Sequence, residues 1–163
     1  MNIVLAGMPG SGKTTVAKLF ESSGKKIYDT DEQIVKEHGN ITEIFQKFGE
    51  SYFRQLETEA VKKLCGLDGI VIATGGGCLL KDENVKLLKG NGKIVYLRAK
   101  PQTLIERLQG DTSRPLLAGG LQERIYKLYG ERASVYESAA DIIMDTDGQT
   151  PARIVRRITE LII

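Results

Sequence analysis

The sequence of 163 residues predicts an α/β protein, a three-layer α/β/α sandwich whose central sheet has five parallel strands. Short apolar runs alternate along the chain with stretches in which apolar residues recur at helical spacing. Strands that alternate with helices pair in parallel through right-handed crossovers. A second observation is the glycine-rich segment that directly follows the first apolar run. The predicted strands are residues 3–6, 26–29, 70–74, 94–98 and 141–145.

The glycine-rich segment, GMPGSGKT at residues 7–14, fits the pattern G-x-x-x-x-G-K-[ST] of a phosphate-binding loop. Glycines let the backbone wrap closely, so that consecutive N–H groups point at phosphate oxygens. We expect Lys13 to reach the β- and γ-phosphates of a nucleoside triphosphate and the Thr14 hydroxyl to ligate Mg²⁺. An apolar strand at 2–6 and a helical pattern over 15–22 favour this interpretation over a chance match.

Composition excludes several classes of protein. Hydrophobic residues make up 41% and charged residues 27%, which is ordinary for a globular domain, and the net charge of +2 predicts neither nucleic-acid nor membrane binding. No segment approaches the roughly 20 apolar residues of a membrane span. We expect no signal peptide, because the sequence begins with a predicted strand and not with a charged region followed by a long apolar stretch. Cys65 and Cys78 fit no metal spacing, and His38 stands in a polar turn. We expect a cytoplasmic protein, and nothing requires more than a monomer.

We expect a single domain over residues 1–163, because the chain has no linker, internal repeat or low-complexity tract. Two segments are predicted to be additions to its core. A helical insertion covers about 31–65 and is interrupted near Gly49. A polar and then glycine-rich segment at about 109–120 has the length of a functional lid. The apolar positions expected on the faces of the insertion are Ile44, Phe45, Phe48, Phe53, Leu56, Ala60 and Leu64.

Polar residues follow the second predicted strand, at the sheet edge where parallel sheets bind ligands. Asp29 and Asp31 bracket a threonine there. If the strand continues to Asp31, both carboxylates share one face, where one positions Mg²⁺ and the other an attacking hydroxyl. The alternative is a turn in which Asp31 is the N-cap of a helix over 32–38.

Three consecutive glycines, Gly75, Gly76 and Gly77, follow the third predicted strand. Ordering them loses backbone entropy, so some geometric need must retain them. Close approach of the backbone to a ligand is one such need. A tight turn into a helix that begins near Asp82 is the alternative.

Arginines supply candidate anion contacts. Arg54 shares a helix face with Glu57, three residues on, and its planar guanidinium suits a carboxylate or a phosphate; Arg132 offers the same chemistry. A surface ion pair is the alternative for both. Arg114 lies in the candidate lid, where it could close on a transferring phosphoryl group, and Arg107, one turn before that lid, is a weaker candidate for the same role. Solvated loop arginines are the alternative there.

Taken in order, these motifs resemble the shikimate kinase family over nearly the whole chain, from residue 7 to about 151. The matching pieces are GMPGSGKTT (7–15), DTD (29–31), FRQLE (53–57), TGGG (74–77), RPLL (114–117) and ERASVY (131–136). The resemblance implies a P-loop fold like that of nucleoside monophosphate kinases. It also implies ATP-dependent phosphorylation of the 3-hydroxyl of shikimate, giving shikimate 3-phosphate and ADP, a step of chorismate and aromatic amino-acid biosynthesis.

The resemblance further implies residue roles on the ATP side. Thr14 would ligate Mg²⁺ with help from Asp29, Lys13 and Arg114 would act on the transferring group, and Gln149 would border the adenine. The residues that would hold the ATP phosphates are Gly10, Ser11, Gly12, Lys13, Thr14 and Thr15.

On the acceptor side, the resemblance implies that Asp31 binds shikimate hydroxyls and orients the attacking one. Arg54 and Arg132 would clamp the shikimate carboxylate, with Gly76 adding a backbone contact and Glu57 holding Arg54. Two arginines and an aspartate suit a small hydroxylated acid.

Two other functions remain open on the residues alone. Another small-molecule or nucleotide kinase of the same fold could hold an acceptor phosphate with Arg54 and Arg132. A nucleotide-dependent switch without transferase activity would not need the set Asp31, Arg54 and Arg132.

Overall fold

Five parallel strands form one sheet, in the order β2-β3-β1-β4-β5, within the part of the chain that the computed structural model describes, residues 1–110 and 120–162. All five lie where the apolar runs predict them. Their bounds are β1 (Asn2–Ala6), β2 (Ile27–Asp29), β3 (Val71–Ala73), β4 (Gly92–Arg98) and β5 (Ile142–Asp145).

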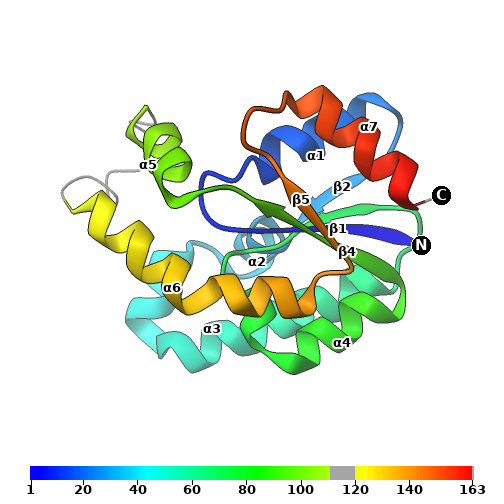
Figure 1. Ribbon diagram of the computed structural model, residues 1–163. Helices are drawn as coiled ribbons and strands as arrows, with labels where there is room; N and C mark the ends of the chain where they lie inside the picture. Colours follow the sequence, from blue (N-terminus) through cyan, green and yellow to red (C-terminus); the bar gives the residue numbers. More distant parts are fainter. Residues whose placement is uncertain (111–119, 163) are drawn as a thin grey trace.

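Helices cover both faces of this sheet (Figure 1). Their bounds are α1 (Lys13–Ser22), α2 (Thr30–His38), α3 (Ile41–Cys65), α4 (Asp82–Gly90), α5 (Pro101–Gln109), α6 (Leu121–Ala139) and α7 (Pro151–Ile162), with a short 3₁₀ turn η1 (Cys78–Leu80). Side chains alternate along β1, so Ile3 and Leu5 pack with α1 and α7, whereas Val4 and Ala6 face α3, α4 and α6. The α/β/α sandwich predicted from the sequence is confirmed.

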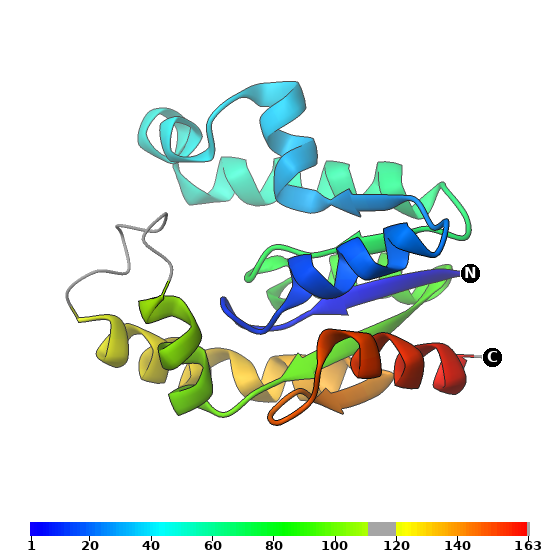
Figure 2. The same ribbon diagram turned by 90° about the horizontal axis from the view of Figure 1, so that it is seen from above.

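The carboxyl ends of the strands all meet at one edge, because every pairing is parallel. β1 lies at the centre of the sheet, so the glycine loop that follows it emerges in the middle of that edge. Figure 2 shows the α2–α3 pair and the α5–α6 pair on opposite sides of this loop. Of the lid predicted at about 109–120, residues 111–119 lie outside the described part of the chain.

The prediction that Asp29 and Asp31 share one face of a strand is wrong, because the second strand ends too early. β2 stops at Asp29, and α2 begins at Thr30, so strand alternation does not relate Asp29 to Asp31. The alternative that makes Asp31 the N-cap is also wrong, because Asp29 takes that place. Its Oδ1 accepts hydrogen bonds from the N–H groups of Asp31 at 2.8 Å and Glu32 at 3.1 Å.

Helix α3 bends at Gly49, as predicted, where φ is 82° and ψ is 176°. Ile44 and the predicted apolar residues after the bend are buried. Phe45 and Phe48, predicted to lie on the same apolar faces, are exposed. They lie before the bend and pack on neighbouring aromatic rings. The ring centroids are 4.8 Å apart for Phe45 and Phe53 and 4.7 Å apart for Phe48 and Tyr52.

Within the described residues, no helix combines the length and the apolar character that crossing a membrane requires.

The bend at Gly49 yields a stability prediction. A side chain at this φ and ψ is strained, although a Cβ there would meet nothing within 4 Å. We expect Gly49→Ala to lower the free energy of unfolding by about 1–3 kcal/mol in urea titrations. The matched control is Gly130→Ala inside α6, where φ is not positive and a Cβ also has open space; it should stabilise by about 0.5–1 kcal/mol. Equal effects at both positions would contradict the assigned strain.

Candidate active site

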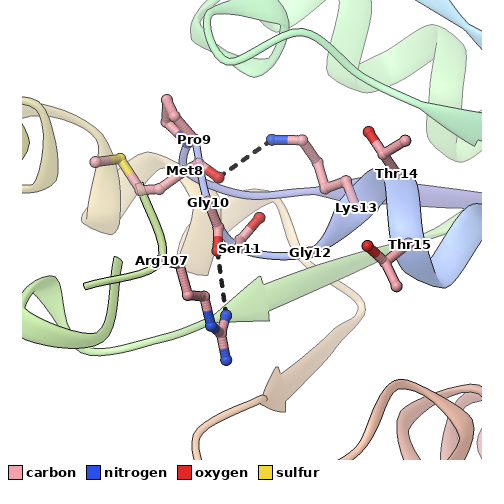
Figure 3. A pocket seen from close by; sticks show the side chains of 9 residues that line it. All are labelled: Met8, Pro9, Gly10, Ser11, Gly12, Lys13, Thr14, Thr15 and Arg107. Carbon is pink, nitrogen blue, oxygen red and sulfur yellow. Dashed lines mark hydrogen bonds between the residues drawn. The ribbon is translucent and has the colours of Figure 1, made fainter. Parts of the chain in front are cut away.

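The glycine loop after β1 encloses a pocket of about 280 Å³ (Figure 3). Gly12 starts α1 in the left-handed conformation, with φ 95°, so the loop passes directly into the helix N-terminus. The pocket is lined by the six predicted phosphate-binding residues and three others: Met8, Pro9, Gly10, Ser11, Gly12, Lys13, Thr14, Thr15 and Arg107. The loop, its helix and its open pocket together are suited to bind an anion.

Two cationic side chains contact carbonyl groups of this loop (Figure 3). Lys13 Nζ donates to the carbonyl oxygens of Gly7 and Met8. Arg107 Nη1, from α5, donates to the carbonyl of Gly10 at 3.1 Å. A bound phosphate would offer both groups charged oxygens, which are stronger acceptors than carbonyls.

The turn at residues 75–77, hereafter the glycine turn, brings the three predicted acceptor residues together. A Cβ atom on Gly75 would lie 2.6 Å from Asp31 Oδ1, and one on Gly76 would lie 2.6 Å from Arg132 Nη1. One on Gly77 would lie 2.5 Å from both terminal nitrogens of Arg54. The glycines therefore leave room for three side chains, a need that differs from the predicted approach of the backbone to a ligand. Asp31, Arg54 and Arg132 come from α2, α3 and α6, which sequence distance alone cannot place together.

Arg54 is held by carboxylates of its own helix. Its Nη1 donates to Glu57 Oε1 at 3.0 Å, and its Nη2 contacts Glu50 at 3.4 Å. Glu57 is buried, and its Oε2 has no hydrogen-bond partner among the described residues. Burial raises the pKa of Glu57, an effect that the positive charge of Arg54 opposes. The carboxylate of this pair is buried and the guanidinium is partly buried, so the pair is not the exposed surface pair of the alternative.

Asp31 is half-buried beside the glycine turn. Burial raises its pKa above the usual value of 3.8, and the negative charge of Asp29 raises it further. Lys13 and Arg54 act in the opposite direction. A carboxylate with a raised pKa, between the phosphate loop and an arginine, is suited to accept a hydrogen bond from a hydroxyl group.

The described residues hold no cluster of three or more His, Cys, Asp and Glu side chains arranged for a metal ion. That fits Mg²⁺ in a phosphate-transfer site, which takes one or two protein oxygens and completes its shell with water and substrate phosphates. Thr14 lines the pocket, and Asp29 uses only Oδ1 for its N-cap bonds. Both are oxygen donors of the kind that Mg²⁺ prefers.

Two predicted ATP-side residues are not part of the pocket that the structure describes. Gln149 lies in the connection between β5 and α7, where its Nε2 donates to the Asp145 carbonyl and its Oε1 accepts from Arg157 at 3.2 Å. Arg114 lies outside the described residues. The assigned roles of both remain predictions from the sequence.

The structure brings two further residues to the site, one that the sequence predicts only weakly and one that it does not predict. Arg107 ranked below Arg114, but its place on α5 puts it against the phosphate loop. Tyr136 was not singled out, yet its hydroxyl donates to the carbonyl of Gly76 at 2.6 Å. Its position four residues after Arg132, on the same helix face, was the available signal.

Comparison with known proteins agrees with this geometry. The family model described as shikimate kinase matches residues 9–163. The shikimate kinase of Thermodesulfovibrio yellowstonii is 47% identical over 160 residues, which cover 96% of this chain and 92% of the relative. A solved shikimate kinase from Acinetobacter baumannii, in complex with shikimate, has a TM-score of 0.88 at 34% identity and covers 99% of this chain and 92% of its own. The solved shikimate kinase from Bacteroides thetaiotaomicron has a TM-score of 0.90 at 31% identity, and the match covers 99% of this chain and 98% of that one. The chain belongs to the shikimate kinase family.

Proposed function

We propose that this protein transfers the γ-phosphoryl group of ATP to the 3-hydroxyl of shikimate, forming shikimate 3-phosphate and ADP. The observation that carries the proposal is the convergence of Asp31, Arg54 and Arg132 on the glycine turn. A nucleotide switch has no need of this arrangement. In the family, this reaction is a step of aromatic amino-acid biosynthesis.

The acceptor pocket is proposed to bind shikimate at both ends. Arg54 and Arg132 hold the carboxylate, since planar guanidinium groups match its two oxygens. Glu57 keeps Arg54 in place through the 3.0 Å bond. Asp31 accepts hydrogen bonds from the ring hydroxyls, and Gly76 adds a backbone contact.

On the donor side, the phosphate loop and Lys13 hold the phosphates of ATP. Arg107 is close enough to the loop to exchange its bond with the Gly10 carbonyl for one with a phosphate. Arg114 and Gln149 keep the roles that the family resemblance implies. Positioning of the two reactants and stabilisation of charge supply most of the catalysis in phosphoryl transfer.

Asp31 is proposed to orient the attacking hydroxyl and to take up its proton. Its raised pKa brings the carboxylate closer to the pH of the reaction, which favours proton transfer. Mg²⁺, held by Thr14 and Asp29 together with the phosphates, would neutralise charge on the transferring group when bound. We further propose a cytoplasmic monomer of one domain, with ATP and shikimate as its small-molecule partners.

The reaction is tested by coupled ADP release with shikimate, quinate, gluconate and nucleoside monophosphates as acceptors. We expect turnover with shikimate well above background ATP hydrolysis, and removal of Mg²⁺ with EDTA should abolish it. Turnover with a nucleoside monophosphate and none with shikimate would favour the nucleotide-kinase alternative. ATP hydrolysis that no acceptor stimulates would favour the switch.

Replacing Asp31 by Asn should lower kcat by about 10²–10⁴-fold, because the hydroxyl loses its proton acceptor. Glu32→Gln, an exposed carboxylate in the same helix turn, is the control and should leave kcat unchanged. The wild-type activity should also fall on the acid side at a pH above 3.8, since the pKa of Asp31 is raised. An unchanged kcat for Asp31→Asn would exclude this role.

The same substitution should raise stability at pH 7. The folded pKa of Asp31 lies above its usual value of 3.8, so folding is penalised wherever the carboxylate is ionised. Below pH 3.8 both the folded and the unfolded chains carry a protonated Asp31, and the advantage of Asn disappears. Urea titrations across pH 3–7 measure this; a gain that grows toward acid pH would contradict the raised pKa.

Replacing Arg54 by Lys should raise the KM for shikimate by roughly 10–100-fold, because one ammonium group cannot reproduce the two-pronged contact of guanidinium. The KM for ATP should change little. Stability should also fall, since Glu57 is buried and loses its 3.0 Å partner. Arg156→Lys, in an exposed pair with Glu160 on α7, is the matched control and should be neutral in both assays. Unchanged shikimate kinetics for Arg54→Lys would remove Arg54 from the acceptor site.

A further inference from the structure

The glycine turn is held by its carbonyl groups in two different ways. The carbonyl of Gly75 accepts from the N–H of Cys78 at 3.1 Å, and that of Gly77 accepts from Leu80 at 3.2 Å. These backbone bonds belong to the short helical turn η1. The carbonyl of Gly76, between them, instead accepts from the Tyr136 hydroxyl of α6 at 2.6 Å. The orientation of the peptide that joins Gly76 to Gly77 therefore depends on a side chain.

Such a peptide needs an external bond, because glycine backbones adopt many conformations at little steric cost. The described chain contains no cis peptide, so the N–H of Gly77 points opposite to the Gly76 carbonyl. The bond from Tyr136 thus sets the direction of this N–H group, on the glycine whose Cβ position lies 2.5 Å from the terminal nitrogens of Arg54. It also fixes Gly76, which packs against Arg132.

Tyr136 and Arg132 are coupled through their helix. They are four residues apart on α6, and the Tyr136 hydroxyl and Arg132 Nη1 lie 3.9 Å and 2.6 Å from the same Cβ position on Gly76. Tyr136 is buried, and its ring packs on Tyr96 of β4 with a centroid distance of 5.1 Å. A buried ring that packs on a neighbouring ring has little freedom, so the hydroxyl is a rigid support for both Gly76 and the guanidinium of Arg132.

We propose that the Tyr136 hydroxyl is a positioning group for acceptor binding, which orients the Gly76–Gly77 peptide and places Arg132 for the acceptor carboxylate. It acts through these neighbours and does not itself contact the reacting atoms. The inference rests on the proposed function, because the carboxylate is that of shikimate.

The test compares the hydroxyl groups of two tyrosines whose rings pack on each other. Tyr136→Phe removes the hydroxyl that bonds to Gly76. Tyr96→Phe removes a buried hydroxyl that has no hydrogen-bond partner among the described residues, so no bond is lost. We expect Tyr136→Phe to raise the KM for shikimate roughly tenfold, about the effect of one lost buried hydrogen bond, with kcat and the KM for ATP within about twofold of wild type. Tyr96→Phe should match the wild-type protein in the KM for shikimate, the KM for ATP and kcat.

A binding measurement separates positioning from a general loss of structure. The rise in melting temperature that shikimate produces should shrink for Tyr136→Phe, while the rise that ADP produces should not. Tyr136→Met, which also lacks the hydroxyl but keeps apolar bulk, should repeat the shikimate effect if the phenylalanine variant is unstable.

Equal shikimate KM values for Tyr136→Phe and Tyr96→Phe would overturn the inference while leaving the proposed function intact. For Tyr136→Phe, a parallel rise in the KM for shikimate and the KM for ATP, or a fall in kcat alone, would also overturn the inference. Either result is what a purely structural role of the hydroxyl predicts. Absence of shikimate turnover in the wild-type protein would instead refute the proposed function, and the inference with it.

Discussion

The site depends on the absence of side chains at residues 75–77. Each of the three glycines is in contact with a different functional group, and a methyl group on any of them would lie 2.5–2.6 Å from a nitrogen or oxygen of Arg54, Arg132 or Asp31. The three side chains come from different helices, and this turn is the surface on which they meet. None of these three glycines has a positive φ, so their backbone conformation alone does not require glycine. The constraint on these positions is therefore the space that a side chain would occupy.

Sheet order brings this turn to the phosphate loop. β3, which precedes the glycine turn, pairs directly with β1, which precedes the loop, and Leu5 lies beside Ala73 in the register. The Thr74 hydroxyl and N–H both donate to the Leu5 carbonyl at 3.0 Å, so the two strand ends are tied where the chains leave the sheet. The phosphate loop and the glycine turn are therefore adjacent, which places the proposed donor and acceptor sites side by side at neighbouring strand ends.

The sequence predicted the features that depend on local pattern: the apolar strands, the phosphate loop and the bend at Gly49. It failed at two local features, after Asp29 and before Gly49, and at one contact that depends on long-range packing. Asp29 and Asp31 read as a strand-end pair, but the chain turns into a helix after Asp29, which uses its carboxylate as the N-cap. Phe48 fits an apolar face by spacing, but the bend removes it from the core. The bond from Tyr136 to Gly76 joins residues 60 positions apart, so the local pattern indicates only that Tyr136 shares a helix face with Arg132 and not which group it contacts.

The electrostatics of the acceptor pocket show a cost that substrate can relieve. Glu57 is buried with one oxygen unpaired in the described structure, and the pKa of Asp31 is raised by burial and by Asp29. Both carboxylates would be better solvated in the unfolded chain. They are kept because each balances a cation: Glu57 orients Arg54, and Asp31 faces both Lys13 and Arg54. Hydroxyl donors of an acceptor would relieve the cost at Asp31, and the carboxylate of the same acceptor would share the arginines with Glu57. A hydrogen-bond acceptor beside two cations is the combination that suits the hydroxylated acid of the proposed function.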